Sequence, residues 1–323
     1  MSDLSAGSWV IIGSSVQGAS HKRGGLPNQD AIFAHPRIDV ASAMAVAAPP
    51  LILAVSDGHG SPRSFRSGTG ANTAVQVAVE RTKEFIDHFQ GENLRPDVIR
   101  DITQNRLPAE IVRSWKKEVL EHFSKNPFDE EEMRKVQAAV GNHANELKED
   151  QGLYLAYGAT LIVVAITESY ILCLQIGDGD ILVVGDDGES VEVPIPPDLS
   201  MVGNETASLC LQSAQNLFRS SFRSLDDLRP HLIAVSTDGY FNSFADTPSF
   251  QKIGPDFLKL IRTHGIDHVR REMGSWLDQA SDRGSGDDIT LGLMFRQGAQ
   301  AMPADLPTIG FEGQAPDKEG NAP

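Results

Sequence analysis

The hydrophobic positions near the start of the chain have the period of β-strands. A β-branched run at residues 9–16 is followed by a stretch rich in glycine, proline and asparagine at 21–30, and then by another apolar piece. This order predicts a strand, a loop and a second strand. The apolar run at 51–55 is too short for a globular helix and ends in Ser-Asp-Gly-His-Gly at 56–60. We interpret it as a buried strand that ends in an irregular loop.

The spacing then changes to that of helices. Apolar side chains recur every three or four residues over 71–89, which predicts an amphipathic helix lying on a sheet. Helical spacing continues through 92–150, where Pro108 is placed to open a helix. Further on, Asp129 with Glu132 is predicted to form an N-terminal cap. We therefore predict a helical insert at about residues 92–150.

From residue 159 the strand period returns. Apolar segments at 159–167, 170–176 and 181–184 are separated by short polar or glycine-rich pieces. One of these connections is Gly177-Asp178-Gly179, and Asp187-Gly188 follows the last segment as a typical hairpin turn. Connections this short predict antiparallel pairing between successive strands.

The last third of the chain repeats this alternation of strands and helices. Residues 194–227 have no clear period, whereas 231–236 and 288–295 are predicted strands and 255–280 is predicted to be helical. Strands grouped before and after blocks of helices favour an α+β layered fold built on antiparallel sheets. Residues 299–323 are rich in proline and glycine and lack any apolar period, so we expect a disordered tail.

Composition narrows the class of protein. With 323 residues and 40% hydrophobic residues, the chain has enough apolar material for a full core. A net charge of −16 repels phosphate backbones and anionic lipids, so neither nucleic acid nor a membrane is an expected partner. The two cysteines, Cys173 and Cys210, support neither a disulfide framework nor a zinc site. Residues 1–8 lack the pattern of a signal peptide, and we expect a soluble, cytoplasmic protein.

Several aspartates share one kind of position, at or beside the end of a predicted strand with small or turn-forming neighbours. Taken alone, any of them is best explained as a solvated turn, and Asp187 serves as a control for that reading. If the others converge, their repulsion would demand protonation or a cation, and oxygen-only ligands select hard ions such as Mg²⁺ or Mn²⁺. The aspartates in question are Asp30, Asp57, Asp178, Asp238 and Asp287.

Six motifs that carry these aspartates stand in a recognisable order. They are Asn28-Gln29-Asp30, Ser56-Asp57-Gly58-His59-Gly60, Tyr157-Gly158-Ala159-Thr160-Leu161, Ile176-Gly177-Asp178-Gly179-Asp180, Ser236-Thr237-Asp238-Gly239 and Gly286-Asp287-Asp288-Ile289-Thr290. Their order and approximate spacing resemble those of the metal-dependent type 2C (PPM) protein serine/threonine phosphatases of bacterial type. The resemblance extends from about Trp9 to Phe295. It implies an antiparallel β-sandwich flanked by helices on both faces, a four-layer α-β-β-α domain over residues 1–298.

The resemblance also implies roles for the motif residues. Position by position, Asp57 would bridge two Mn²⁺ or Mg²⁺ ions, with the Gly58 carbonyl as a further ligand and Asp30 in support. Asp238 and Asp287 would hold the second ion, and Asp178 matches a family position for a third, weaker one. The implied reaction is attack on phosphorus by a metal-bridging hydroxide.

His59 matches the family's general acid, which would protonate the leaving serine or threonine oxygen. Two departures from the family pattern stand out. Many relatives carry a phosphate-gripping arginine where this chain has Gly25, so Arg23, displaced upstream, is our candidate. Asp180 stands where many relatives carry arginine, and its role is open between the third metal site and substrate binding.

Other mechanisms find no support in the sequence. Neither cysteine has an arginine six positions later, which excludes a cysteine-based phosphatase, and no Gly-Lys pair provides a nucleotide-binding P-loop. Two functions remain open. The first is an active phosphatase that acts on phosphorylated proteins and is expected to be a monomer. Whether a cognate serine/threonine kinase is a second partner is left open by the sequence. The second is a catalytically weak, phosphatase-like domain that binds phosphoproteins or signals.

Overall fold

The computed structural model describes residues 8–37, 45–89, 95–148, 152–197, 206–225 and 227–297. Within this part of the chain the strands form two antiparallel sheets. The six-stranded sheet has the order β3 (Ala45–Ala47), β1 (Trp9–Val16), β11 (Ile289–Arg296), β10 (Leu232–Ser236), β7 (Asp180–Val184) and β8 (Val191–Glu192). The five-stranded sheet has the order β2 (Ala31–His35), β4 (Leu51–Ser56), β5 (Leu161–Ile166), β6 (Tyr170–Ile176) and β9 (Arg219–Ser224).

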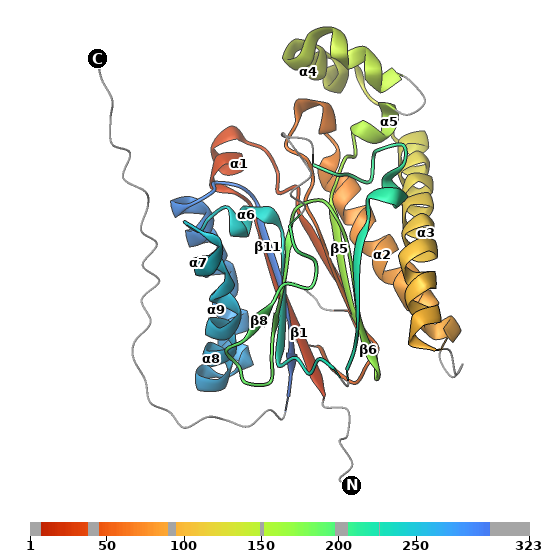
Figure 1. The fold of residues 1–323 in the computed structure, drawn as a ribbon. Helices are drawn as coiled ribbons and strands as arrows, with labels where there is room; N and C mark the ends of the chain where they lie inside the picture. The colour runs from red at the N-terminus through yellow and green to blue at the C-terminus, as the bar shows by residue number, and fades with distance from the viewer. Residues whose placement is uncertain are drawn as a thin grey trace.

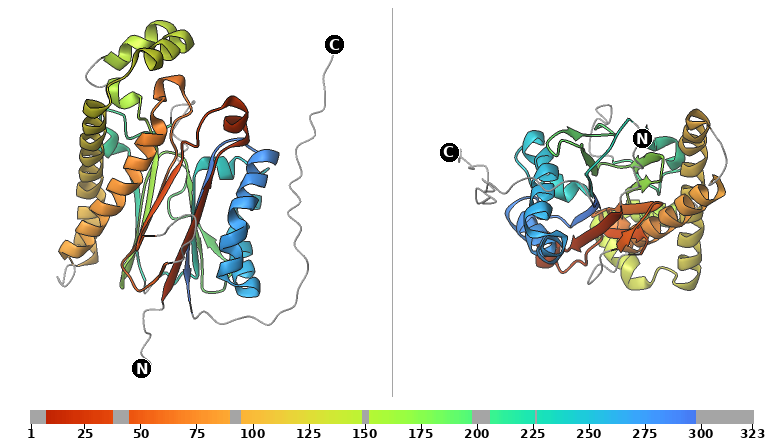
Figure 2. Two further views of the ribbon diagram at one scale, coloured as in Figure 1. Left: turned by 180° about the vertical axis from the view of Figure 1, so that it is seen from behind. Right: turned by 90° about the horizontal axis from the view of Figure 1, so that it is seen from below.

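The two sheets pack face to face, and helices cover both outer faces (Figures 1 and 2). Helices α2 (Ser67–Phe89) and α3 (Pro96–Lys125) lie on the five-stranded sheet, and α8 (Ile253–His264) and α9 (Ile266–Arg283) lie on the six-stranded sheet. The predicted four-layer α-β-β-α architecture is therefore confirmed.

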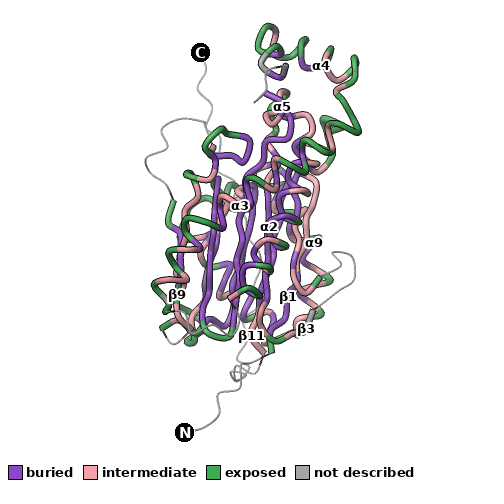
Figure 3. The backbone as a smooth tube through the Cα atoms, turned by 90° about the vertical axis from the view of Figure 1, so that its right-hand side faces the viewer, coloured by how far each residue is buried: buried purple, intermediate pink, exposed green. Residues whose placement is uncertain are grey.

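Three apolar layers hold these four layers together. The layer between the sheets includes Leu53, Val164 and Ile233, and the two outer layers pack each sheet against its helices. Figure 3 shows the strands as the most continuously buried part of the backbone. Because both faces of each sheet are covered, central strands such as β5, with the sequence LIVVAI, are uninterrupted apolar runs.

One predicted pairing is wrong, and the correction matters for the site. The short connection Gly177-Asp178-Gly179 does not join a hairpin, because β6 pairs with β5 and β9 in one sheet whereas β7 pairs with β10 and β8 in the other. Gly177 has φ +104, which glycine adopts without strain, and so lets the chain turn sharply from sheet to sheet. Asp178 consequently lies at the crossover between the two sheets.

Helix boundaries also differ from the predictions in two places. Pro108 does not open a helix but lies inside α3, which begins at Pro96. The proline removes one backbone hydrogen bond, yet the helix continues because Leu107 and Ile111 are buried against the core. The predicted helix at 255–280 is two helices, α8 and α9, separated at Gly265 with φ +82.

A short helix stands where a loop was predicted. Residues of the 21–30 loop contribute to α1 (Ala19–Gly24), which ends at Gly25 with φ +67. Tertiary contacts rather than local spacing hold this helix, since the Ala19 amide donates to Ser281 Oγ at 3.0 Å. No sequence period could have revealed that contact.

The two halves of the predicted 92–150 insert behave differently. Helix α3 belongs to the outer helical layer, whereas α4 (Glu130–Val140) projects beyond the ends of the sheets (Figure 1). The cap predicted at the start of α4 is present, with Glu132 N–H donating to Asp129 and Asp129 N–H donating to Glu132. The predicted tail at 299–323 lies outside the described residues. In the described part, no helix is both long and apolar enough to cross a membrane.

Candidate metal centre

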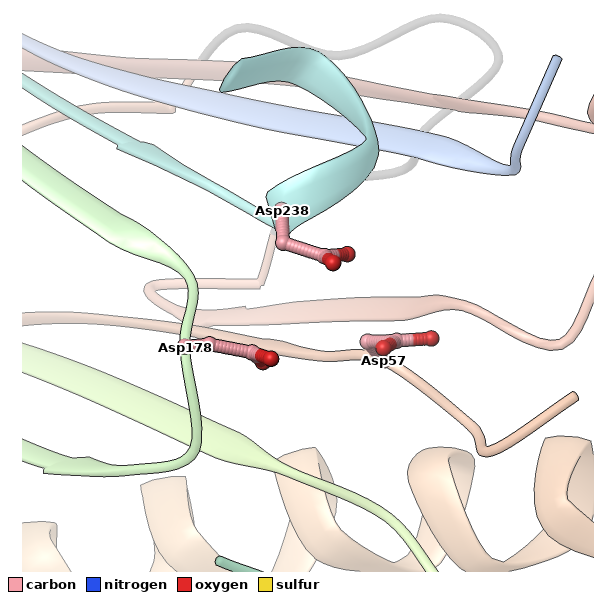
Figure 4. A group of neighbouring side chains, drawn as sticks. All are labelled: Asp57, Asp178 and Asp238. Carbon is pink, nitrogen blue, oxygen red and sulfur yellow. The ribbon is translucent and has the colours of Figure 1, made fainter. Parts of the chain in front are cut away.

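Three aspartates from three separate elements meet at one end of the sandwich. Asp57 follows β4, Asp178 lies at the crossover from β6 to β7, and Asp238 opens α6 (Asp238–Phe241) after β10. Each offers a carboxylate oxygen, and these oxygens lie within 4.8 Å of one another. Figure 4 shows the three side chains pointing into a common space. The structure thus brings together aspartates that are as much as 181 positions apart (238 − 57 = 181) in the sequence.

Hydrogen bonds hold the backbone of Asp57 and the carboxylates of Asp178 and Asp238. The Asp57 amide donates to Thr160 Oγ1 at 3.0 Å, which anchors the turn after β4 to the start of β5. Thr206 Oγ1 donates to Asp178 Oδ2 at 2.9 Å, and Asn242 Nδ2 donates to Asp238 Oδ2 at 3.0 Å. The Asp178 and Asp238 side chains therefore have a defined direction before any ligand arrives.

Two glycines permit the close packing of the turns around the site. A Cβ on Gly179 would lie 2.5 Å from the Ser236 carbonyl oxygen, and one on Gly239 would lie 2.2 Å from the Asp288 carbonyl oxygen. Any larger residue would force these backbones apart. The Asp-Gly pattern of the sequence is here a packing requirement as well as a turn signal.

Asp30 lies behind this group and is buried at 6% exposure. Thr237 Oγ1 donates to Asp30 Oδ2 at 2.7 Å, while Asp30 Oδ1 is buried without a hydrogen-bond partner in the described part of the chain. Burial raises the pKa of Asp30 to about 7, even though the bonds from Thr237 and Thr290 oppose the shift. A buried carboxylate oxygen with no donor is suited to receive a cation or a water bound to one.

The aspartates of this cluster also repel one another electrostatically. Burial, followed by the charges of Asp30, Asp238, Asp287 and Asp178, raises the pKa of Asp57 well above its usual range. The pKa of Asp238 rises to about 6, through burial and then through Asp178 and Asp287. Carboxylates that destabilise one another in this way are stabilised together by divalent cations, and an all-oxygen donor set fits Mg²⁺ or Mn²⁺. The residues present therefore fit the metal ions that the resemblance implies.

Asp287 lies at the rim of the site, with its side chain 51% exposed. The neighbouring Asp288 is buried and accepts three hydrogen bonds, from the Gly18 amide at 2.6 Å, the Gln29 amide at 2.7 Å and His21 Nδ1 at 2.9 Å. Asp288 thus ties the start of β11 to α1 and to the segment before Asp30. That contact sets the position of Asp287 on the rim.

His59 is half-buried beside the aspartates. Its amide donates to the Gly158 carbonyl at 3.1 Å, and a Cβ on Gly158 would lie 2.6 Å from the imidazole Cδ2. Burial lowers the pKa of His59, while the negative charge of Asp178 opposes that shift. Gly58, between Asp57 and His59, is itself packed so closely that a Cβ would lie 2.6 Å from the Gln29 carbonyl oxygen.

Arg23 and Asp180 are the two residues at which the sequence departs from the family pattern. Arg23 is exposed on α1, where Nη2 donates to Ser20 Oγ at 3.0 Å and lies beside Gly286 at the rim. Asp180 begins β7, and burial followed by the charges of Asp238 and Asp178 raises its pKa to about 7. Arg23 is thus placed near Asp287, and Asp180 adds a further acid beside the three carboxylates.

Three residues of the site have structural roles that the sequence did not predict, although they lie within the six motifs. They are Thr160, Thr237 and Asp288, which anchor Asp57, Asp30 and the segment of Asp287 respectively. All three residues lie inside the six motifs, which is the signal that could have identified them. Their roles depend on partners far away in the chain, which no local spacing reveals.

Comparison with solved structures finds the same fold in a bacterial phosphatase. The structure of a bacterial serine phosphatase matches with a TM-score of 0.50 at 14% identity, covering 89% of this chain and 98% of that one. The serine/threonine phosphatase PstP/Ppp of Mycobacterium tuberculosis gives 0.47 at 13% identity, with 90% and 99% coverage. Stp1 from Staphylococcus aureus gives 0.47 at 15% identity, with 89% and 95% coverage.

The family follows from the sequence itself. The family model described as protein phosphatase 2C matches residues 17–278, and this chain belongs to that family. A comparison with curated proteins finds no match. The resemblance drawn from the six motifs is confirmed at the level of the family.

Proposed function

We propose that this chain is a metal-dependent protein phosphatase that hydrolyses phosphoserine and phosphothreonine. The observation that carries the proposal is that carboxylate oxygens of Asp57, Asp178 and Asp238, from three separate parts of the chain, lie within 4.8 Å of one another. The protein phosphatase 2C family supports the reaction class. Phosphorylated proteins are the proposed substrates, and the two buried free cysteines fit the reducing environment of a cytoplasmic protein.

The proposed ligands would hold two metal ions, with a third, weaker site at Asp178. Asp57 would be shared by the first two ions, and the Gly58 carbonyl and Asp30 would help to hold one of them. Asp238 and Asp287 would serve the other ion, and Asp178 a third. Bound at this site, two divalent cations would supply activated water and charge compensation for the phosphoryl group. The aspartates supply no nucleophile of their own, so their task is to hold and orient.

His59 would act as the general acid for the leaving oxygen. Only its protonated form can donate to a serine or threonine alkoxide, and burial disfavours that form while Asp178 favours it. Turnover of phosphoserine should therefore weaken as pH rises above the pKa of His59. Arg23, at the rim beside Gly286, remains our candidate for contacting the substrate phosphate.

Phosphate release from a phosphoserine or phosphothreonine peptide tests the proposal. We expect turnover with Mn²⁺ or Mg²⁺, none after chelation, and a loss on the order of 10³-fold or more in Asp57→Asn. Asp187→Asn, a change in an exposed hairpin turn, is the matched control and should retain activity.

Wild-type metal-dependent turnover in Asp57→Asn would refute the assignment of the centre. An inert wild-type protein that still binds phosphopeptides would instead favour the weak, phosphatase-like binding domain. The features that keep this second function in view are Asp180 beside the carboxylates and the exposed position of Arg23.

A further inference from the structure

Arg66 is the centre of a dense network seven residues after His59. Its side chain is only 12% exposed and forms a two-bond pair with Glu132, from Nε at 2.8 Å and from Nη2 at 2.7 Å. Nη1 donates to the Tyr157 hydroxyl at 2.9 Å, and Nη2 donates to the Pro127 carbonyl at 3.1 Å. None of these partners is a candidate metal ligand, so the network needs another explanation.

The network reaches His59 through the backbone of residues 156–158. The His59 amide donates to the Gly158 carbonyl at 3.1 Å, and the Arg66 amide donates to the Ala156 carbonyl at 2.8 Å. The loop between His59 and Arg66 is thus attached at both ends to the same short segment. The imidazole also packs on Gly158, where a Cβ would lie 2.6 Å from Cδ2.

The Tyr157 side chain and backbone make this segment rigid. Its hydroxyl accepts a hydrogen bond from Arg66 and forms another with His122 Nδ1 at 2.8 Å. It therefore connects the loop that precedes α2 with helix α3. A Cβ on Gly70 would lie 1.8 Å from the Tyr157 carbonyl oxygen, which leaves that backbone no room to move towards α2. The Arg66 guanidinium also lies over the Phe128 ring, 4.9 Å from its centroid.

We propose that Arg66 is a positioning residue for His59, acting through Tyr157 and the Gly158 backbone on which the imidazole rests. The guanidinium joins the loop that carries His59, the end of α3 and the start of α4 into one unit. Loss of this joint lets residues 156–158 shift, and a displacement of about 1 Å can lower the rate of a positioned group by on the order of 10²-fold. This inference rests on the proposed function, in which His59 donates a proton.

A comparison of two substrates tests the proposal in the full-length protein with Mn²⁺. A serine alkoxide needs a proton donor, whereas nitrophenolate leaves well without one. We expect Arg66→Met to lower kcat for a phosphoserine peptide by roughly 10- to 100-fold and kcat for p-nitrophenyl phosphate by less than about threefold. Arg66→Lys keeps the positive charge but not the paired guanidinium N–H donors, and its kcat for the phosphoserine peptide should fall less than that of Arg66→Met. Tyr157→Phe should change the ratio of the two rates in the same direction as Arg66→Met.

Arg262→Met is the matched control. Arg262 is also a half-buried arginine, but its Nη2 bonds His231 Nδ1 at 2.8 Å, next to the end of β10 opposite Asp238. The Arg262→Met substitution should lower the melting temperature and leave the ratio of the two rates unchanged. Equal losses on both substrates in Arg66→Met and Tyr157→Phe, or no loss on either, would overturn the proposal. Failure of the proposed function would appear separately, as wild-type protein without metal-dependent turnover.

Discussion

Asp57-Gly58 and Asp187-Gly188 are the same dipeptide in two opposite environments. Asp187 is exposed in the β7–β8 turn, where its Oδ1 accepts bonds from the Ser190 amide at 2.9 Å and the Ser190 hydroxyl at 2.7 Å. These bonds lower the pKa of Asp187. Asp57 is surrounded by other carboxylates, and burial together with their charges raises its pKa. The dipeptide specifies a turn, and the surroundings decide whether the carboxylate is stabilised locally or needs a cation.

Asp238-Gly239 shows that the difference does not come from the turn geometry alone. Like Asp187, Asp238 receives a local hydrogen bond, here from Asn242 at 3.0 Å. Its pKa nevertheless rises to about 6, because burial and the charges of Asp178 and Asp287 outweigh that bond. One local donor does not compensate for several nearby negative charges in a poorly solvated site.

Beside the loss expected in Asp57→Asn, the largest kinetic effect should appear at the residue that directly follows Asp57-Gly58. His59→Ala should slow phosphoserine-peptide hydrolysis by roughly 10²–10⁴-fold, the usual range for general acid catalysis, and affect p-nitrophenyl phosphate far less. Steady-state kcat on the two substrates with Mn²⁺ measures this. His264→Ala, on the exposed end of α8, is the control and should change neither rate. Equal losses on both substrates would point instead to a structural role for His59.

The next effect is on stability in the presence of metal. At a Mn²⁺ concentration of about 100 times Kd, the free energy of unfolding of the wild type should rise by about 2.7 kcal/mol. Asp57→Asn should lose most of that gain, yet exceed the wild type in stability when metal is chelated, because it removes a repelled carboxylate. Asp187→Asn should show the opposite pattern, a full response to Mn²⁺ and slightly lower stability without it. Urea unfolding with Mn²⁺ and with chelator distinguishes the two turns.

The smallest effect is the pH dependence of stability in the metal-free protein. The folded pKa of Asp238, about 6, lies above its unfolded value, so the folded state holds this proton more tightly. Stability from this group is therefore present at about pH 4 and is lost as pH rises to about 6, by on the order of 2 kcal/mol. Asp238→Asn should lack this loss.

The lowered pKa of Asp187 has the opposite sign, so its contribution is present above its unfolded pKa and is lost as pH falls. The difference in unfolding free energy between wild type and each variant, followed from pH 4 to 7 in chelator, isolates the two contributions. Parallel curves for wild type and Asp238→Asn would contradict the electrostatic description of the centre.

Most of the fold could be predicted, because the residues within each segment indicate whether it forms a strand or a helix. Strand β6 has the predicted bounds of 170–176, and the capping box at Asp129 and Glu132 was visible as a pair of residues. The family's motifs also marked where the candidate ligands stand along the chain. The exceptions were elements held by distant partners, such as α1, which depends on Ser281 and Asp288.

The candidate site was predictable as a list of residues and not as an arrangement. The same Asp-Gly dipeptide occurs at Asp57, Asp187 and Asp238, and only the neighbouring motif residues distinguished the hairpin turn at Asp187 from the two candidate ligands. The roles of Asp288, Thr160 and Thr237 could not be predicted, because each contacts a residue more than 100 positions away. Their partners became visible only in the folded chain.

For most segments the sequence by itself determined whether a strand or a helix forms, since the period of the hydrophobic positions fixes which face of the segment is buried. It also determined that the chain carries aspartates at turns. Tertiary structure alone decided that the chain changes sheets at Gly177–Gly179, which carries Asp178 to the ends of β4 and β10. A short connection is compatible with either a hairpin or a crossover, and only packing of the two sheets against each other selects between them. That selection turns three separate carboxylates into one centre.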